Sequence, residues 1–450
     1  MIVRLKKTIC IILCAIVLIS GLNITAYSAT DLNLTGTSAL IYCADTDEVI
    51  YEKNADEKMD LASITKLLTC LVAIEKLDMN QQIEITGEAA SMPKSNIDLK
   101  EGELMSVENL IAASLISSAN DAATALGLAC GGSMENFASM MNDRAAQIGC
   151  TSSNFVNSSG YTVEGHYSTA RDVAKIAKAA FSNKDIRRLA GLSKYTIPAT
   201  NLSSAREIES TNLFLEGFEG DGEELDFKVE KYKGVFGGKT GITVGGECTM
   251  VTGFNHDGME IYCVIMGSTL EGRYSDIKTL MDYAKTVICK YTVFKKDTEF
   301  GTAKLLGGAT NKVKAVAAKE GFINLPEGAS ASLVETKCIY SDSLIAPIKK
   351  GQKIGVVEIY LADDLCGKVD LVAASDIKKG WFLSPFGITN MQTIMMGSAL
   401  GLFIITVITV FVLRIKNKRR IKAIRRERLM EEARRQLERE EELKRRGWHF

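Results

Sequence analysis

Two long apolar segments bracket a stretch in which hydrophobic and polar residues are mixed. The first, residues 9–22, follows three basic residues and precedes the small-residue pattern Ala26-Tyr27-Ser28-Ala29. This order is typical of a secretory signal peptide and its cleavage site, and the run is short for a membrane span. The second, Met391–Leu413, contains no charged residue and is long enough to cross a bilayer. We therefore expect a signal peptide over residues 1–29 and a transmembrane helix over residues 391–413.

Between these segments, hydrophobic spacing predicts one sheet built from the two ends of a domain, with helices between them. Alternating runs at 38–43 and 49–51, and again at 248–254 and 259–266, are typical of β-hairpins. Helical spacing follows Leu67 and recurs at 107–116, 121–130, 134–148, up to Phe181, and at 274–290. The predicted fold class is α/β (α+β): an antiparallel sheet flanked by helices, with a helical block.

Short alternating runs separated by turn residues fill residues 292–379 and predict a small all-β domain. The expected order is a signal peptide (1–29), a main domain (30–290), a β-rich domain (291–385), a transmembrane helix (391–413) and a basic tail (414–450).

The tail gives the chain an orientation. Residues 414–450 hold fifteen Lys or Arg against seven Asp or Glu, a net charge of +8. Because positive flanks mark the cytoplasmic side of a span, the bulk of the chain is expected outside the membrane. With Arg4, Lys6 and Lys7 also set aside, the total of −1 leaves −12 for the exported part. So acidic a surface disfavours nucleic acid as a partner.

A serine and a lysine three residues apart open an apolar helix. Ser63 and Lys66 stand on one helical face, so the hydroxyl and the amine come within hydrogen-bond reach. Burial lowers the pKa of an amine, which lets Lys66 remove the proton of Ser63. Ser-x-x-Lys also occurs at Ser91, Ser275 and Ser375, so the apolar helix after Ser63, rather than the tetrapeptide, singles it out.

Ser118 and Asn120 follow the next apolar helix and point to one side of a turn. A serine there relays a proton to a leaving group, and the amide fixes a substrate carbonyl. An ordinary helix cap is the alternative. We interpret His166, one of three histidines, as structural.

Lys239, Thr240 and Gly241 follow two further glycines. The glycines let a substrate backbone approach a strand edge, and the lysine charge with the threonine hydroxyl suits a free carboxylate. The alternative is a surface turn beside a strand.

The motifs Ser63-Ile64-Thr65-Lys66, Ser118-Ala119-Asn120 and Lys239-Thr240-Gly241, in this order, resemble those of the penicillin-recognising serine enzymes. The residues around them are similar to the low-molecular-mass D-alanyl-D-alanine carboxypeptidases, over about residues 38–290. Residues 292–379 resemble, less specifically, the β-rich C-terminal domain of these enzymes. The chain departs from the family in having Gly237-Gly238 before Lys239, which predicts a looser strand edge and leaves the substrate preference open.

The resemblance implies a serine-type carboxypeptidase acting on peptidoglycan stem peptides that end in D-Ala-D-Ala. Ser63 would attack the penultimate D-alanine carbonyl while Lys66 takes its proton, and backbone N–H groups of Ser63 and Ile242 would hold the oxyanion. β-Lactam antibiotics would be covalent inhibitors. The enzyme would lie at the cell membrane with its catalytic domain outside and its tail in the cytoplasm. The remaining implied roles are proton return by Ser118, substrate positioning by Asn120, and carboxylate binding by Lys239 and Thr240 beside Gly241.

Three other functions can be compared with this one. A class A β-lactamase shares the motifs but requires a Glu-x-x-Leu-Asn sequence, which does not occur here. A zinc carboxypeptidase is disfavoured because His166, His256 and His449 are scattered and no Cys-x-x-Cys motif occurs, so no metal or cofactor is expected. A non-catalytic cell-wall-binding or sensing protein on the same scaffold stays open.

Overall fold

The computed structural model describes residues 31–93, 95–220, 226–325, 330–445 and 447. The predicted signal peptide lies outside these residues. The chain divides into two compact units, Met1–Tyr291 with Ile323–Ala331, and Thr292–Phe322 with Ser332–Phe450. Each unit is described by itself.

The first unit contains a five-stranded antiparallel sheet in the order β2-β1-β11-β10-β9. The N-terminal hairpin pairs with the C-terminal one, for example Leu40 opposite Val264, so the prediction of one sheet built from both ends of the domain is confirmed. Residues 248–254 are buried without alternation, which means that both faces of the sheet are covered. The strands are β1 (Ser38–Cys43), β2 (Glu48–Lys53), β9 (Val235–Ile242), β10 (Cys248–His256) and β11 (Met259–Ser268).

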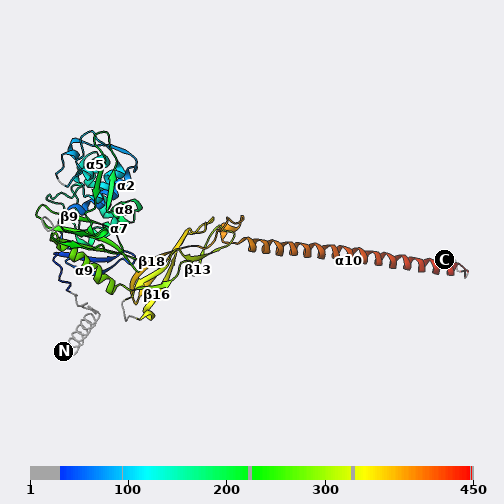
Figure 1. Ribbon diagram of the computed structural model, residues 1–450. Helices are drawn as coiled ribbons and strands as arrows, with labels where there is room; N and C mark the ends of the chain where they lie inside the picture. Colours follow the sequence, from blue (N-terminus) through cyan, green and yellow to red (C-terminus); the bar gives the residue numbers. More distant parts are fainter. Residues whose placement is uncertain (1–30, 94, 221–225, 326–329, 446, 448–450) are drawn as a thin grey trace, which may run out of the picture. The chain divides into compact units, whose positions relative to one another are not determined.

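Helices pack on this sheet and form the predicted block above it (Figure 1). The helices α7 (Ala170–Phe181) and α9 (Gly272–Val287) both contact β11. The central helix α2 (Thr65–Lys76) is buried along nine consecutive residues, because α4, α5, α6 and α7 all pack against it. The other helices are α3 (Gly87–Ala90), α4 (Val107–Ile116), α5 (Asn120–Gly131), α6 (Met134–Ile148) and α8 (Lys184–Ala190), with short 3₁₀ turns η1 (Ala62–Ile64) and η2 (Leu213–Leu215).

Three small antiparallel pairs complete the first unit. They are β3 (Gln82–Glu84) with β4 (Leu104–Ser106), β5 (Lys194–Ile197) with β6 (Arg206–Glu209), and β7 (Phe218–Glu219) with β8 (Lys228–Val229). Strands β12 (Lys290–Phe294) and β15 (Gly321–Asn324) also pair.

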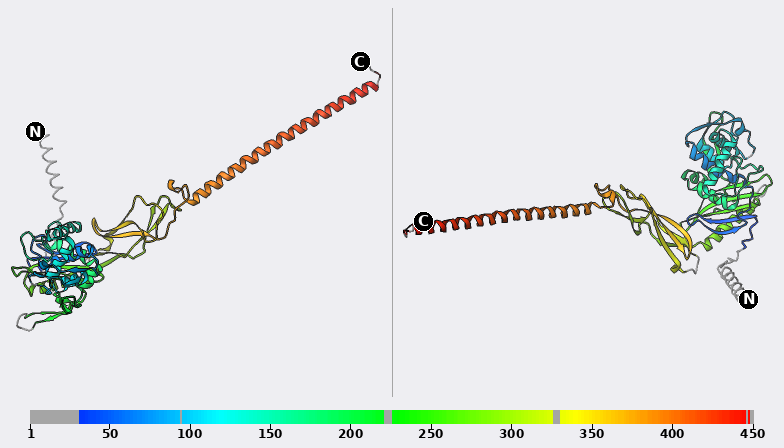
Figure 2. Two further views of the ribbon diagram at one scale, coloured as in Figure 1. Left: turned by 90° about the horizontal axis from the view of Figure 1, so that it is seen from above. Right: turned by 180° about the vertical axis from the view of Figure 1, so that it is seen from behind.

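The second unit holds the predicted β-rich domain and one long helix. Its sheet has the order β13-β14-β18-β17-β16 and is drawn in yellow tones in Figure 2, where α10 continues in orange and red. The helix α10 (Asn390–Arg445) runs for 56 residues, and among the described residues it alone is long and apolar enough to cross a membrane. The strands are β13 (Glu299–Lys304), β14 (Lys312–Ala317), β16 (Val334–Tyr340), β17 (Lys353–Leu361) and β18 (Asp364–Ala373), with 3₁₀ turns η3 (Ala331–Leu333) and η4 (Ser384–Phe386).

Candidate active site

The backbone just before α2 is held in an unusual conformation. Ala62 has a φ of +47°, in the left-handed region that non-glycine residues rarely adopt. Its N–H donates to Asp60 Oδ1 (2.8 Å), and its carbonyl accepts from Thr65 Oγ1 (2.8 Å). These contacts fix the 3₁₀ turn that carries Ser63 at the head of the buried helix.

Lys66 lies directly beside Ser63. Its Nζ is 2.8 Å from Ser63 Oγ, 2.7 Å from Asn120 Oδ1 and 2.6 Å from the carbonyl oxygen of Ser159. The side chain is completely buried. Burial lowers the pKa of Lys66 to about 7, against the opposing influence of Cys70 and Asp121.

The three hydrogen-bond partners of Lys66 determine which of them the lone pair of its neutral amine faces. A neutral amine has two N–H bonds and one lone pair. A carbonyl oxygen cannot donate, and neither can Asn120 Oδ1, whose amide is oriented by the bond from Nδ2 to the Pro93 carbonyl (3.0 Å). Asn120 and Ser159 therefore take both N–H bonds, and the lone pair is left for the one partner that carries a hydrogen, the Ser63 hydroxyl.

Ser118 and Asn120 do not form a helix cap. Ala119 occupies the capping position of α5, where no side chain makes a capping hydrogen bond. Ser118 has a φ of +65°, and its Oγ accepts from Lys239 Nζ at 2.9 Å. Asn120 therefore contacts Lys66, and Ser118 contacts Lys239.

Lys239 and Thr240 lie within strand β9, so the alternative of a surface turn is wrong. Lys239 is completely buried, and its Nζ contacts Ser118 Oγ and the Thr240 carbonyl (both 2.9 Å). Burial, together with the positive charges of Lys66 and Arg273, holds the pKa of Lys239 well below its ordinary value. The Thr240 hydroxyl donates to Thr211 Oγ1 (2.7 Å).

Two glycines of β9 lie where the strand is tightly packed. A Cβ on Gly241 would lie 2.4 Å from Thr249 Oγ1 and 2.9 Å from Ala62 Cβ, and a Cβ on Gly238 would lie 2.7 Å from the Val251 carbonyl oxygen. Gly241 therefore lets β9 approach the turn that carries Ser63.

An open cleft of about 360 Å³ lies over these residues. Lys66 and Lys239 do not line it, but each contacts a residue that does, Ser63 and Ser118 respectively. The residues that line it are Ser63, Ser95, Ser118, Asn120, Gly160, Tyr161, Thr162, Thr211, Thr240, Gly241, Ile242, Thr243, Val244 and Arg273.

Arg273 is a cleft residue that the sequence analysis missed. It lies in the first turn of α9, is 6% exposed, and donates through Nη1 to the Gly241 carbonyl (3.4 Å). Its Nε is buried without a hydrogen-bond partner among the described residues. A guanidinium that lines a cleft suits a carboxylate. An arginine directly after a hairpin is the only signal in the sequence, and it is a weak one.

The wall of the cleft that contains Ser95 is held by the start of α5. The N–H of Asn120 donates to the Ser95 carbonyl (2.7 Å), and the Asp121 carboxylate accepts the N–H groups of Ile97 (3.1 Å) and Leu99 (3.0 Å). Asp121 is 1% exposed. Asp121, the residue after Asn120, is thus a buried carboxylate that fixes the loop containing Ile97 and Leu99.

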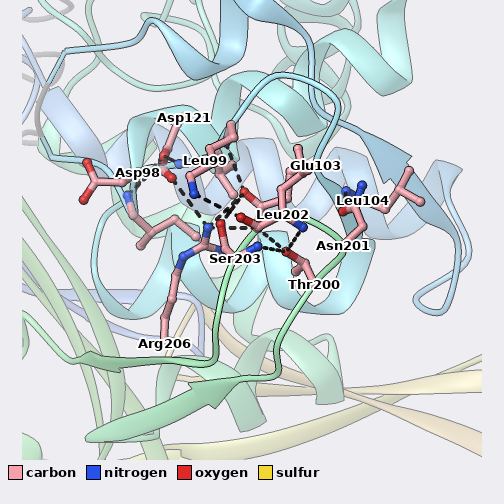
Figure 3. Close-up of polar contacts among 12 residues, drawn as sticks. Asp98, Leu99, Glu103, Leu104, Asp121, Thr200, Asn201, Leu202, Ser203 and Arg206 are labelled. Carbon is pink, nitrogen blue, oxygen red and sulfur yellow. Dashed lines mark hydrogen bonds and ion pairs between the residues drawn. The ribbon is translucent and has the colours of Figure 1, made fainter.

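The end of the same loop is fixed by a second buried carboxylate (Figure 3). Glu103 is completely buried, lies 2.8 Å from Arg206 Nη2 in an ion pair, and accepts from Thr200 Oγ1 (2.7 Å). Burial raises the pKa of Glu103, but the hydrogen bonds from Arg206 and Thr200 outweigh it and hold the pKa below its ordinary value. This cluster ties the loop to the β5–β6 hairpin.

His166 has a positioning role next to the site. Its Nδ1 accepts from the Val156 N–H (3.2 Å), which leaves Nε2 to donate to Thr65 Oγ1 (2.8 Å). Burial lowers its pKa to about 4, so the ring is neutral at ordinary pH. It supports the threonine that holds the Ala62 carbonyl, in keeping with the structural interpretation.

Solved structures with this architecture define a class of protein. Penicillin-binding protein 5 from Haemophilus influenzae is similar at a TM-score of 0.59 and 24% identity, covering 77% of this chain and 98% of that one. The peptidoglycan synthesis regulatory factor PBP3 from Streptococcus pneumoniae gives 0.63 at 22% identity, covering 77% and 100%. The fold is that of the penicillin-binding proteins.

The family follows from the sequence comparison. Residues 25–269 match the D-alanyl-D-alanine carboxypeptidase family, and residues 290–379 match the C-terminal domain of penicillin-binding protein 5. The chain belongs to the D-alanyl-D-alanine carboxypeptidase family.

Curated relatives carry the same family name. D-alanyl-D-alanine carboxypeptidase DacF of Bacillus subtilis is 28% identical over 353 residues, 77% of this chain and 87% of that protein. DacC of Escherichia coli is 27% identical over 351 residues, which cover 74% of this chain and 82% of that protein. The predicted family, fold class and serine carboxypeptidase function are confirmed, and the β-lactamase and non-catalytic alternatives are not favoured.

Proposed function

We propose that Ser63 forms the acyl-enzyme through which this carboxypeptidase removes the terminal D-alanine of a peptidoglycan stem peptide, and that β-lactams acylate the same oxygen. The observation that carries the proposal is the position of Lys66, 2.8 Å from Ser63 Oγ with its other two partners both pure acceptors. This arrangement supports a general base aimed at a single hydroxyl.

In the first step, Ser63 Oγ attacks the carbonyl carbon of the penultimate D-alanine, and its proton passes to Lys66. The negative charge moves to the carbonyl oxygen, where the backbone N–H groups of Ser63 and Ile242 stabilise it. Both residues line the same cleft. Asn120, held by Pro93 and Lys66, keeps the amine in place.

In the second step, the bond to the leaving D-alanine breaks and its nitrogen takes a proton from Ser118. Lys239, 2.9 Å away, resupplies Ser118. Water then attacks the ester carbon of Ser63 and its proton passes through Ser118 to Lys239. Lys66 returns the proton that it took to Ser63 Oγ as that oxygen leaves, and the shortened peptide departs. Each transfer joins atoms already within hydrogen-bond distance or atoms of the bound substrate.

The terminal carboxylate is bound by Thr240 and Arg273, both of which line the cleft. Lys239 is completely buried and touches Ser118 instead, so it acts on the cleft only through Ser118. The resemblance gives carboxylate binding to Lys239 and Thr240, whereas this assignment keeps Thr240 and replaces Lys239 by Arg273. It accounts for action at chain ends, because only the last residue of a peptide places a main-chain carboxylate directly after the bond that is cleaved.

We also propose that α10 anchors the enzyme in the cell membrane through residues 391–413, with the first unit outside and the basic tail in the cytoplasm. The support is the apolar window of α10 and the positive charge that follows it.

Labelling with a fluorescent penicillin tests the assignment of Ser63. The intact chain is expected to take up one covalent label and to release D-alanine from a synthetic pentapeptide, while Ser63→Ala does neither. Ser375→Ala is the matched control, since it removes the serine of another Ser-x-x-Lys sequence in the second unit. Label on Ser63→Ala, or an intact chain that binds the peptide without releasing D-alanine, would overturn the proposal.

A further inference from the structure

Five large hydrophobic side chains are exposed on the second unit near the start of α10. Trp381 is 51% exposed, Phe382 77% and Phe386 80%, and Leu306 and Ile345 are 53% and 65% exposed. We call these five residues the basal patch. Soluble domains bury aromatic groups of this size or use them for contact with a partner.

Backbone hydrogen bonds hold the three segments of the basal patch together. Leu306 N–H donates to the Leu344 carbonyl, and Ala346 N–H donates back to Leu306 (both 2.9 Å). The neighbouring Gly307 N–H donates to the Ser384 carbonyl at 3.1 Å, within the turn that ends at Phe386. The patch is therefore one surface of the folded β-rich domain.

The same surface is joined to the start of α10. The N–H of Trp381 donates to Asn390 Oδ1 (2.9 Å), and the N–H of Asn390 donates to the Ala309 carbonyl (3.2 Å). The uncharged apolar segment begins at Met391, five residues after Phe386. Five residues span at most about 18 Å, so a bilayer crossed by this segment lies within reach of the patch.

Lysines accompany the aromatic residues. The sequence Ile-Lys-Lys-Gly occurs at 348–351 and again at 377–380, and the two isoleucines pair in a β-bridge. Lys378 and Lys379 are exposed and are separated from Trp381 only by Gly380. Tryptophan beside lysine is the combination found at the interface of a membrane, where the ring lies at headgroup depth and the ammonium meets phosphate.

We propose that the basal patch is seated in the headgroup region of the outer leaflet, so that the β-rich domain rests on the lipid surface through Trp381, Phe382 and Phe386. The proposal depends on the proposed anchoring by α10. A lipid surface is the occupant because the anchor that starts at Asn390 brings the patch to a bilayer, whereas nothing comparable brings it to a second copy of the chain.

The chain allows a direct test because it contains two tryptophans, Trp381 and Trp448. Full-length Trp448→Phe is reconstituted into vesicles of phosphatidylcholine and phosphatidylglycerol whose acyl chains carry bromine at a shallow or a deep position. Flotation of the vesicles first measures anchoring. We expect Trp381 emission to be blue-shifted, quenched at least twofold by shallow bromine, and quenched less by deep bromine.

A matched control moves the tryptophan to the other end of the same sheet. The triple variant Trp381→Phe, Trp448→Phe, Leu365→Trp places it at the start of β18, at a position that is 45% exposed. It is expected to float equally well and to show no bromine quenching.

The remaining outcomes separate the two proposals. Protein that floats while Trp381 stays unquenched by either bromine overturns the seating and leaves the anchor intact. Equal quenching at positions 381 and 365 also overturns the seating. So does a blue shift of Trp381 that depends on protein concentration and occurs without quenching, because a second copy of the chain then covers the patch. Protein that does not float overturns the anchoring, and the seating with it.

Discussion

At the level of single residues, we expect the protonation state of Lys66 to decide whether Ser63 can react. The amine is surrounded by one hydroxyl and two acceptors, so protonation fills the one lone pair that faces the nucleophile. Burial is the main reason that the neutral form is accessible near pH 7. The site therefore uses burial, rather than a second charged residue, to prepare its base.

A pH dependence follows. The pKa of Lys66 is about 7, and only the neutral amine accepts a proton. The second-order rate of acylation by penicillin is therefore expected to fall about tenfold per pH unit below about pH 7 and to level off above it. Stopped-flow labelling between pH 5.5 and 9 measures this.

Two controls accompany the pH profile. Lys66→Arg keeps its charge at every pH and is expected to be unreactive throughout, whereas Lys76→Arg changes an exposed lysine at the other end of the same helix and should follow the intact chain. A flat profile for the intact chain from pH 5.5 to 8 would contradict the role of Lys66.

The sequence identified the side chains of the three motifs but not Arg273 or Asp121. Motif residues carry a recognisable spacing, and Lys66 meets Ser63 within one helix turn. Arg273 reaches the cleft only because α9 follows β11 and folds back beside β9, and Asp121 acts on backbone groups 22 and 24 residues away. Contacts of this kind depend on the tertiary fold and leave no local pattern.

Among elements, the contact between β9 and the Ser63 turn is tightly constrained. We expect Gly241→Ala to push the strand away from Ala62, because its Cβ would lie 2.9 Å from Ala62 Cβ and 2.4 Å from Thr249 Oγ1. Acylation should slow at least tenfold while the thermal midpoint changes little. Gly245→Ala is the control, since the nearest atom to its Cβ lies 3.7 Å away. Equal rates in the two variants would show that the strand tolerates the shift.

The buried ion pair between Glu103 and Arg206 makes a prediction about stability. Arg206→Met leaves the completely buried carboxylate of Glu103 uncompensated, at a cost of about 3 kcal/mol in the free energy of unfolding. The exposed pair Arg188–Glu108 is the control, and Arg188→Met should cost less than about 1 kcal/mol. Urea unfolding at pH 7 compares them.

The stabilisation from the Glu103–Arg206 ion pair is expected to be lost at low pH. In the intact chain the pKa of Glu103 is held below its ordinary value of 4.5, so the folded state binds the proton less readily than the unfolded one. The stabilisation is complete above pH 4.5 and is lost as pH falls through the lowered pKa. A cost of Arg206→Met that is the same at pH 7 and pH 3 would contradict the ion pair.

The larger elements were predictable because their periodicity is strong. The helix at 134–148 was predicted at its observed bounds, and both hairpins occur where alternation placed them. Loops and short strands are all that the sequence predicts over 81–102, and the pairs β3–β4 and β5–β6 were not located, because strands of three or four residues carry too little alternation and depend on neighbours such as Glu103. The continuity of α10 was also missed, since its apolar and charged parts differ in composition.

At the scale of the whole molecule, the proposed chemistry and the proposed anchoring belong to different parts of the chain. Every cleft residue lies in the first unit, and α10 lies in the second. A chain that ends after Thr389 is therefore expected to stay with the soluble fraction while full-length protein floats with vesicles. Its acylation rate by penicillin and its release of D-alanine from a soluble pentapeptide should match those of the full chain within about twofold.

The informative measurement is the comparison of a soluble with a membrane-associated substrate. Because truncation leaves Ser63, Lys66 and the cleft unchanged, it should lower turnover only of pentapeptide chains attached to vesicle-bound lipid, where the anchor raises the local concentration of enzyme. An equal loss on both substrates would mean that residues after 389 support the fold of the first unit. If the truncated and the full chain turned over both substrates at the same rate, the anchor would have no part in access to substrate.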